Sequence, residues 1–246
     1  MKNIFKTLFA GVASMLAVVA CTDAERDMDS GVLRVKLSTD TSVYTRAESG
    51  IVAPDAAEFD LTVSSVDGEY TNRWESLTDL TAETKFEVGE YQIKATYGDV
   101  ENEGFDAPAF VAENTCRIMP SQTALVNMVA TVANSGVRVA YTDAFLRYFK
   151  EWSVELVSGN GNSFVFDEEE SRVAYVAPKP FVIEIEYVKP NGTAGAKSIE
   201  VSDVNPRTFY NVRLDVNGGE VGAAKIVVSF DDSVADEKVE IEIDEQ

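Results

Sequence analysis

The chain has 246 residues, of which 45% are hydrophobic, and it carries a formal net charge of −21 at pH 7. Such a charge repels phosphate backbones, so it argues against nucleic-acid binding. The sequence contains no histidine, which excludes histidine-activated nucleophiles and histidine-ligated zinc. The apolar content is sufficient for one large or two ordinary hydrophobic cores.

The N-terminal segment has the pattern of a lipoprotein signal peptide. Lys2 and Lys6 precede an apolar run from Leu8 to Ala20, and Cys21 follows directly. The run is shorter than the ~20 residues that span a bilayer. We therefore predict that residues 1–20 are removed, which changes the net charge to −23, and that Cys21 carries acyl chains such as palmitate that hold the protein on a membrane. The alternatives are a transmembrane anchor, or a secreted protein in which Cys21 is incidental.

Residues 21–30 are acidic and contain few apolar residues, which predicts a tether between the lipid and the folded part. Acidic residues directly after a lipidated cysteine also resemble the signal that sends lipoproteins of Bacteroides-type bacteria to the outer face of the outer membrane. This resemblance implies an outer-membrane lipoprotein exposed at the cell surface.

From residue 31 onward the pattern is that of an all-β protein. Apolar and polar residues alternate in short runs, and turn formers such as Asp67-Gly68 and Asn191-Gly192 separate the runs. One segment differs, because a capping Asp143, preceded by Thr142 and followed by apolar residues on one helical face, predicts a short helix near residues 143–150 that closes one end of a sandwich. The predicted strands cover residues 32–37, 59–63, 91–97, 115–118, 137–141, 152–156, 182–187, 212–216, 226–230 and 239–243.

The two halves of the chain resemble each other weakly, which indicates a duplication with a boundary at residues 133–135. The predicted fold is two tandem antiparallel β-sandwich domains, transthyretin-like or immunoglobulin-like, over residues 31–133 and 134–246. The recurring segments are Gly31–Val35 with Gly136–Val139, Phe59–Val63 with Trp152–Leu156, and Thr123–Ala130 with Thr208–Asp215.

The residues do not form a recognisable catalytic or metal-binding motif. After Cys21 only Cys116 is left, and its alternation with Ile118 predicts a buried apolar role. The acidic clusters Asp167–Glu170 and Asp231–Glu237 suit Ca²⁺ chemically but lack the spacing of an EF-hand, so we expect solvated loops. A carboxylate pair for glycoside hydrolysis stays formally open among the many acidic residues. We expect no enzymatic activity, metal or cofactor.

Aromatic residues outside the alternating runs are candidates for ligand contact. Trp74 lies in a polar context, and Tyr70 and Phe110 flank loops. Such side chains stack on sugar rings and other planar groups. They support one interpretation of the function, a surface accessory lipoprotein that captures a glycan or nutrient.

Several segments resemble an uncharacterised lipoprotein family of Bacteroides-type bacteria, which has no assigned activity. The architecture is also similar to the fimbrillin superfamily, whose lipoproteins build, cap or anchor surface pili. The segments that carry the family resemblance are Gly31–Leu37, Thr45–Ala47, Phe59–Gly68, Gly89–Asp99 and Phe105–Pro108.

The fimbrillin resemblance implies a non-enzymatic adhesion or pilus-assembly component whose partners are other surface or pilus subunits. In fimbrillins a protease cuts after an arginine in an early loop, the first strand leaves, and a terminal strand of another subunit takes its place. Arg46-Ala47 lies in the corresponding loop, and the tail strand with Val239, Ile241 and Ile243 on one face has the form of a donor. The alternatives are an ordinary loop arginine, and a tail strand that belongs to its own domain.

Overall fold

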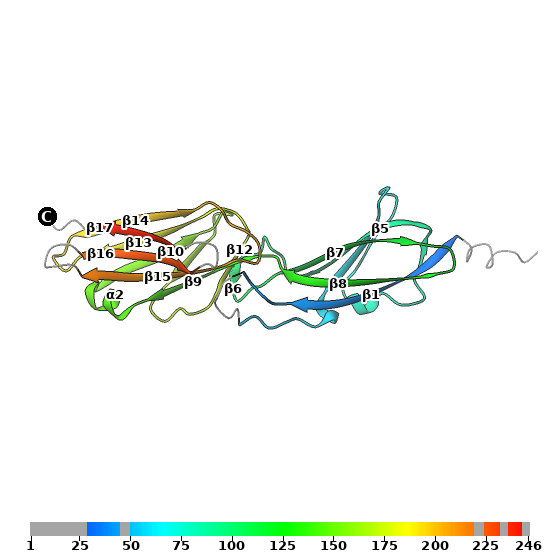
Figure 1. Cartoon of the computed structure of the whole chain (residues 1–246), viewed down its shortest axis with the longest axis horizontal. Coiled ribbons are helices and arrows are strands. Elements are labelled where there is room, and N and C mark those ends of the chain that lie inside the picture. The colour runs from blue at the N-terminus through cyan, green and yellow to red at the C-terminus, as the bar shows by residue number, and fades with distance from the viewer. Residues whose placement is uncertain (1–28, 45–49, 219–223, 232–235, 243–246) are drawn as a thin grey trace, which may run out of the picture.

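The computed structural model describes residues 29–44, 50–218, 224–231 and 236–242. They form an elongated molecule of two β-sandwiches that follow each other along the long axis (Figure 1). Strand β1 (Ser30–Asp40) begins at one tip of the molecule, and the second sandwich occupies the opposite end (Figure 1). The predicted all-β class is confirmed.

The first sandwich is a single seven-stranded sheet folded over on itself. Its strands are β1, β2 (Asp60–Ser65), β3 (Thr71–Trp74), β4 (Lys85–Glu87), β5 (Gly89–Tyr97), β7 (Phe110–Ile118) and β8 (Thr123–Val132), in the order β3-β2-β5-β7-β8-β1-β4. Strands β7 and β8 pair only through two residues of each at one corner, and the sheet splits there into the layers β3-β2-β5-β7 and β8-β1-β4. Inward-facing residues such as Leu61, Ile93 and Leu33 form the core between the layers. Two 3₁₀ turns, η1 (Ala56–Glu58) and η2 (Leu77–Asp79), lie in the connections.

The second sandwich consists of two sheets. One has four strands in the order β11-β10-β13-β14, and the other has six in the order β17-β16-β15-β9-β12-β6. The core between them contains Val154, Ile183, Val212 and Ile226, each fully buried. The strands are β6 (Gly104–Phe105), β9 (Ser135–Tyr141), β10 (Glu151–Val157), β11 (Ser163–Phe166), β12 (Ala174–Val176), β13 (Phe181–Val188), β14 (Ala194–Val201), β15 (Phe209–Gly218), β16 (Ala224–Asp231) and β17 (Asp236–Glu242).

Both sandwiches use the same arrangement of seven strands. The layer β3-β2-β5-β7 corresponds to β11-β10-β13-β14, and β8-β1-β4 corresponds to β15-β9-β12. These correspondences include the three pairs of segments that recur in the sequence. The predicted antiparallel pairing is wrong at two places, because β1 pairs in parallel with β8 and β9 with β15. Parallel neighbours need a long crossover, which the intervening strands of each sandwich provide.

The predicted helix is present as α2 (Asp143–Tyr148) at the outer end of the second sandwich (Figure 1). The N-cap is Thr142 rather than the expected Asp143, and its hydroxyl accepts a hydrogen bond from the amide of Phe145 at 3.2 Å. Asp143 lies in the first turn, where a negative charge favours the helix N-terminus. Phe145 is fully buried, so the apolar face of α2 does cover the end of the core.

One strand crosses from the first half of the chain into the second sandwich. Strand β6 precedes the predicted boundary, yet it pairs with β12 and places Phe105 against the second core. The stretch between β8 and β9 is short, and its Asn134 is fully buried and accepts a hydrogen bond from the amide of Ala109. The two sandwiches are therefore connected by more than a flexible linker.

Candidate functional site

Four of the residues singled out in the sequence lie outside the described part of the chain. They are Cys21, Arg46, Ala47 and Ile243. Lipidation and proteolytic cleavage at these positions stay predictions.

The suggested donor strand is paired within its own sheet. In β17, Val239 lies opposite Val228 of β16, and Ile241 lies opposite Ile226. Strand β17 is the last strand of the six-stranded sheet. It would have to leave this sheet before it could be added to another subunit.

The three candidate aromatic residues do not surround one groove. Tyr70 and Trp74 are half-buried, and the rings of both pack near Phe86, with centroids 5.8 and 6.3 Å away. Phe110 is only 1% exposed and packs on Phe59, with the two ring centroids 6.5 Å apart. The interpretation of Phe110 as a surface contact is therefore wrong, because the first residue of β7 points into the core.

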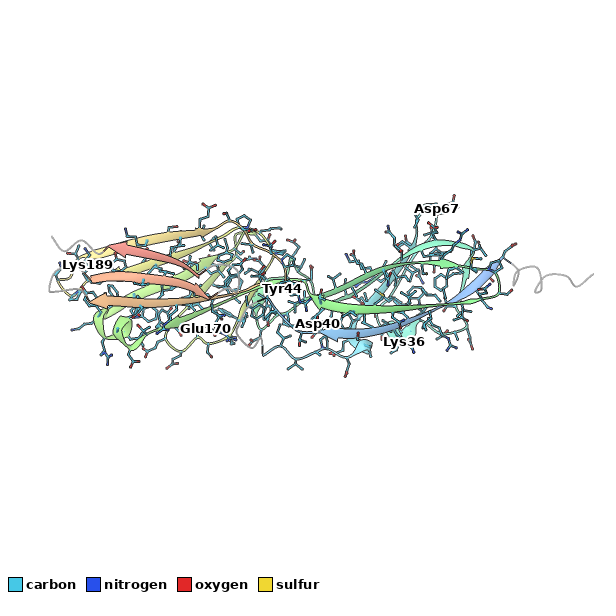
Figure 2. All side chains as sticks on the ribbon, viewed as in Figure 1. Lys36, Asp40, Tyr44, Asp67, Glu170 and Lys189 are labelled. Carbon is cyan, nitrogen blue, oxygen red and sulfur yellow. The ribbon has the colours of Figure 1, made fainter. Side chains whose placement is uncertain are left out.

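A cluster of contacts around Arg207, which we call the Arg207 clasp, joins the end of β1 to the second sandwich. Arg207 Nη2 donates to the carboxylate of Asp40 and to the hydroxyl of Ser42, and Arg207 Nε donates to the Ser42 carbonyl at 2.5 Å. The amide of Tyr44 donates to the Arg207 carbonyl at 3.0 Å, and the guanidinium lies 5.1 Å from the centre of the Tyr44 ring. Asp40 and Tyr44 lie at the waist of the molecule (Figure 2). The clasp therefore holds the residues directly upstream of Arg46 against the second sandwich.

The backbone of Arg207 is itself in an uncommon conformation. Its φ is +65°, in the left-handed region that non-glycine residues adopt only when the surroundings impose it. The amide of Arg207 donates to the Asn134 carbonyl at 2.7 Å, which helps to fix this conformation. On the other side of Arg46, Ile51 packs with Val43 against Tyr175 and its neighbours in the second sandwich.

The Arg207 clasp predicts an acid-dependent loss of stability. The amide and hydroxyl of Ser42, and then Arg207, lower the pKa of Asp40 from 3.8 to about 2. A carboxyl group with a lowered pKa in the folded state stabilises that state above its unfolded pKa and loses this contribution as pH falls from about 4 toward 2. We expect the difference in unfolding free energy between the wild type and Asp40→Asn to shrink over this range in denaturant titrations. A difference that stays constant down to pH 2 would contradict the prediction.

A second group of contacts joins the sandwiches through Glu103. One carboxylate oxygen of Glu103 accepts hydrogen bonds from the Ser158 hydroxyl and from Nδ2 of Asn162 at 2.8 Å, and the other accepts the Ala177 amide at 2.8 Å. These partners lie in two separate connections of the second sandwich. Together with the Arg207 clasp and β6, Glu103 restricts bending between the two sandwiches.

Between the sandwiches lies a groove of about 800 Å³, which we call the junction groove. One side is the outer surface of the sheet that contains β2, β3, β5 and β7, and the other side includes Lys179 and Arg207 from the second sandwich. Three ion pairs line it: Arg73 with Asp60 at 2.7 Å, Lys94 with Glu113 at 2.9 Å, and Lys179 with Glu101 at 2.8 Å.

The sequence alone did not indicate this site. Its residues are far apart in the chain, and surface charges occur throughout the sequence. The available signal was weak, namely basic residues next to proline in Pro178-Lys179-Pro180 and in Pro206-Arg207. Proline fixes the backbone of a loop and so positions its neighbours.

Cys116 and the acidic cluster of residues 167–170 make structural contacts in the described part of the chain. Cys116 is half-buried against the first core, and this burial raises the pKa of its thiol. In the acidic cluster of residues 167–170, Glu170 pairs with Arg172 at 2.6 Å. Within the described ranges, acidic and cysteine side chains do not gather in groups of three that could hold a metal ion. The helices in these ranges are all too short or too polar to cross a membrane.

Comparisons with known proteins give a family and several distant structures. A family model described as "Domain of unknown function (DUF4493)" matches residues 29–245, in agreement with the resemblance to an uncharacterised family. No curated protein matches the chain.

Among solved structures, the fimbrial anchor protein Mfa2 from Porphyromonas gingivalis has 12% identity and a TM-score of 0.41, covering 83% of this chain and 99% of that one. A proposed adhesin from Bacteroides ovatus has 8% identity and a TM-score of 0.43, covering 84% and 96%. A proposed polysaccharide-binding protein from Bacteroides thetaiotaomicron has 10% identity and a TM-score of 0.41, covering 79% and 95%. Likeness at this level carries no functional argument, so the proposals below rest on the geometry of the chain itself.

Proposed function

Because the chain belongs to the DUF4493 family, a domain of unknown function, we propose a function for it from its own sequence and geometry. The protein is a non-enzymatic lipoprotein, anchored through Cys21 in the outer membrane and displayed at the cell surface. It acts as an adhesion or pilus-assembly component that binds other surface subunits by strand addition.

The observation that best supports assembly is the position of β1 in its sheet. Nine consecutive residues of β1, Val32–Asp40, pair with β8, but on its other side only residues 30–32 pair with β4. From Leu33 to Asp40, β1 therefore has one sheet neighbour among the described strands. A long strand with an unpaired edge is a template for a strand from another chain, and its removal would expose the edge of β8.

The Arg207 clasp suggests what limits this assembly. After cleavage behind Arg46, β1 would still be held by β8 and by the bonds from Arg207 to Asp40 and Ser42. Strand exchange would then require both sets of bonds to open. A weaker Arg207 clasp should therefore speed the release of β1, and β1 would still be the strand that is replaced.

This mechanism predicts ladder formation after proteolysis. Complete cleavage after Arg46 in the chain without its signal peptide should give species that run as ladders in mildly denaturing gels. The Arg207→Gly variant should form them faster, because glycine removes the clasp side chain yet tolerates the positive φ. Arg46→Gln serves as the uncleaved control. Persistent monomers after complete cleavage, in both the wild type and Arg207→Gly, would contradict strand addition.

Surface display is tested separately on intact cells. A protease added outside should degrade the wild-type protein, and electron microscopy of the same cells would reveal any filament. The Cys21→Ala variant should be absent from the membrane fraction, because it cannot carry the lipid. A wild-type protein that survives external protease until the cells are lysed would contradict display at the surface.

A second function, capture of a ligand at the cell surface, is favoured by the junction groove. Its volume of about 800 Å³ lies in the range of ligand sites, roughly 300–1,000 Å³. Two hydrophobic cores lie on either side of the groove, and junctions between such units often hold ligands. The aromatic residues that the sequence suggested for ligand binding do not form this site, apart from the buried Phe110 beneath it.

A further inference from the structure

The charges that line the junction groove differ from those of the whole protein. The chain has a net charge of −21, whereas the lining of the groove contains four basic and four acidic residues. The groove is therefore neutral in formal charge on a strongly acidic molecule. An anionic ligand would find no excess of positive charge there, and it would be repelled by the rest of the protein.

The groove also does not suit a cation or a purely apolar ligand. The carboxylates of Asp60, Glu101 and Glu113 are each paired with a lysine or arginine, and the fourth, Asp99, accepts a hydrogen bond from the amide of Glu101 at 3.0 Å, so the acidic residues do not form a group that would hold a cation. An apolar ligand would cover these ion pairs and remove them from water, which costs free energy without new hydrogen bonds. The remaining class is an uncharged ligand rich in hydrogen-bonding groups.

Ion pairs at the surface of the groove can recognise hydroxyl groups. Each pair presents N–H donors and carboxylate acceptors side by side, and a hydroxyl group both donates and accepts. The pair between Lys94 on β5 and Glu113 on β7 and the pair between Arg73 on β3 and Asp60 on β2 lie on the same sheet surface, with Lys94 directly opposite Glu113. Together they place donors and acceptors along one surface of the groove.

An aromatic ring completes the groove. Tyr44 is 57% exposed, and the guanidinium of Arg207 lies 5.1 Å from the centre of its ring. The amide of Tyr44 donates a hydrogen bond to the Arg207 carbonyl, which holds the backbone that carries the ring. An exposed, positioned tyrosine ring can pack against the apolar C–H face of a sugar.

From these features we infer that the junction groove binds a neutral oligosaccharide, stacked on Tyr44 and hydrogen-bonded to the ion pairs Arg73–Asp60 and Lys94–Glu113. This inference rests on the ligand-capture function proposed above and is independent of strand addition. The groove volume of about 800 Å³ is sufficient for a chain of several sugar units, and the absence of excess charge selects against uronic acids and sulfated sugars.

The test uses affinity electrophoresis of the full mature chain in gels that contain neutral polysaccharides, namely a β-glucan, a xylan, a galactomannan and an α-glucan, with polygalacturonate as the anionic comparison. At least one neutral polysaccharide should retard the protein, and polygalacturonate should not. Titration calorimetry with a hexasaccharide of the retarding polymer then gives the affinity. Tyr44→Ala should weaken binding by about tenfold, and Arg73→Ala by severalfold.

Two variants serve as controls. Arg34→Ala removes an exposed arginine from β1, which belongs to the other layer of the first sandwich, and should leave binding unchanged. Trp74→Ala tests the aromatic residue suggested by the sequence, which does not line the groove. Binding that is lost in Trp74→Ala but kept in Tyr44→Ala, retardation by polygalacturonate alone, or no retardation by any polymer would each overturn the inference. None of these results would affect surface display or ladder formation, which are measured separately.

Discussion

Replacing Phe105 by alanine should destabilise the second sandwich by about 2–4 kcal/mol, although the residue precedes the predicted domain boundary. Phe105 lies on β6, and its ring centroid is 5.5 Å from those of both Phe164 and Phe166. The guanidinium of Arg172 covers it at 4.6 Å. The substitution leaves a cavity in the second core and removes these aromatic contacts, so the cost should appear in the second sandwich.

The two tryptophans allow the stability of each sandwich to be measured separately, because Trp74 belongs to the first sandwich and Trp152 to the second. In a Trp74→Phe background, fluorescence during denaturant unfolding follows Trp152 alone, and a Trp152→Phe background follows Trp74. Phe105→Ala should lower the midpoint reported by Trp152 more than that reported by Trp74. Phe105→Leu keeps most of the apolar volume and should cost less. A larger shift at Trp74 would show that β6 supports the first sandwich instead.

Replacing Gly31 by alanine should destabilise the first sandwich by about 2–3 kcal/mol, because there is no space for a Cβ atom at this position of β1. The added atom would lie 2.5 Å from the carbonyl oxygen of Met119 and 2.8 Å from that of Gln122. These two obstacles are backbone atoms of the turn between β7 and β8, and a side-chain carbon of Ile118 lies at 2.8 Å as well, so relief requires the turn or the start of β1 to shift. The substitution should therefore also loosen the strand whose release is proposed for assembly.

Two other glycines calibrate this effect. At Gly89 the nearest atom to an added Cβ is 3.7 Å away, so Gly89→Ala should be nearly neutral. At Gly136, which recurs in the sequence with Gly31, the obstacle is the ring of Phe209 at 2.6 Å, and a side chain can adjust more easily than backbone. Denaturant unfolding should rank the cost as Gly31→Ala, then Gly136→Ala, then Gly89→Ala. Equal costs at Gly31 and Gly89 would contradict the packing argument.

The sequence was sufficient to predict most of the long strands, because each of these buries one face. In β5, β10 and β13, for example, every second residue reaches the core, and this alternation is visible in the order of the residues. Strands β4, β6 and β12 have two or three residues, too few to show a period. Strand β14 was missed for a different reason, since it is an edge strand that keeps most of its side chains in solvent.

Long-range pairings were harder to predict than strands. The repeated segments indicated that β1 and β9 are equivalent, and that β8 and β15 are equivalent, but alternation does not reveal the direction in which two strands pair. The parallel pairing of β1 with β8 therefore emerged only from the structure. The same holds for β6, whose two residues depend on a partner strand in the other sandwich.

The candidate site was the least predictable part of the molecule. Arg207 and Asp40 are separated by 167 positions and meet only because the two sandwiches are joined end to end. The aromatic residues selected from their polar neighbours pack inward instead, since Trp74 covers Phe86 at the edge of the first core. Tyr44, the exposed aromatic residue of the groove, has an ordinary polar loop context and gave no signal of its own.

The parallel pairing of β1 with β8 has a mechanical consequence for a chain tethered at its N-terminus. Tension from the membrane would pull β1 at its first residue, at one tip of the molecule, whereas β8 leads from its last residue into the second sandwich (Figure 1). Two parallel strands pulled at opposite ends are loaded in shear, so the nine residue pairs from Val32↔Thr123 to Asp40↔Thr131 resist together rather than opening one at a time. Whatever binds the far end of the protein would thus pull against the strongest direction of its first sandwich.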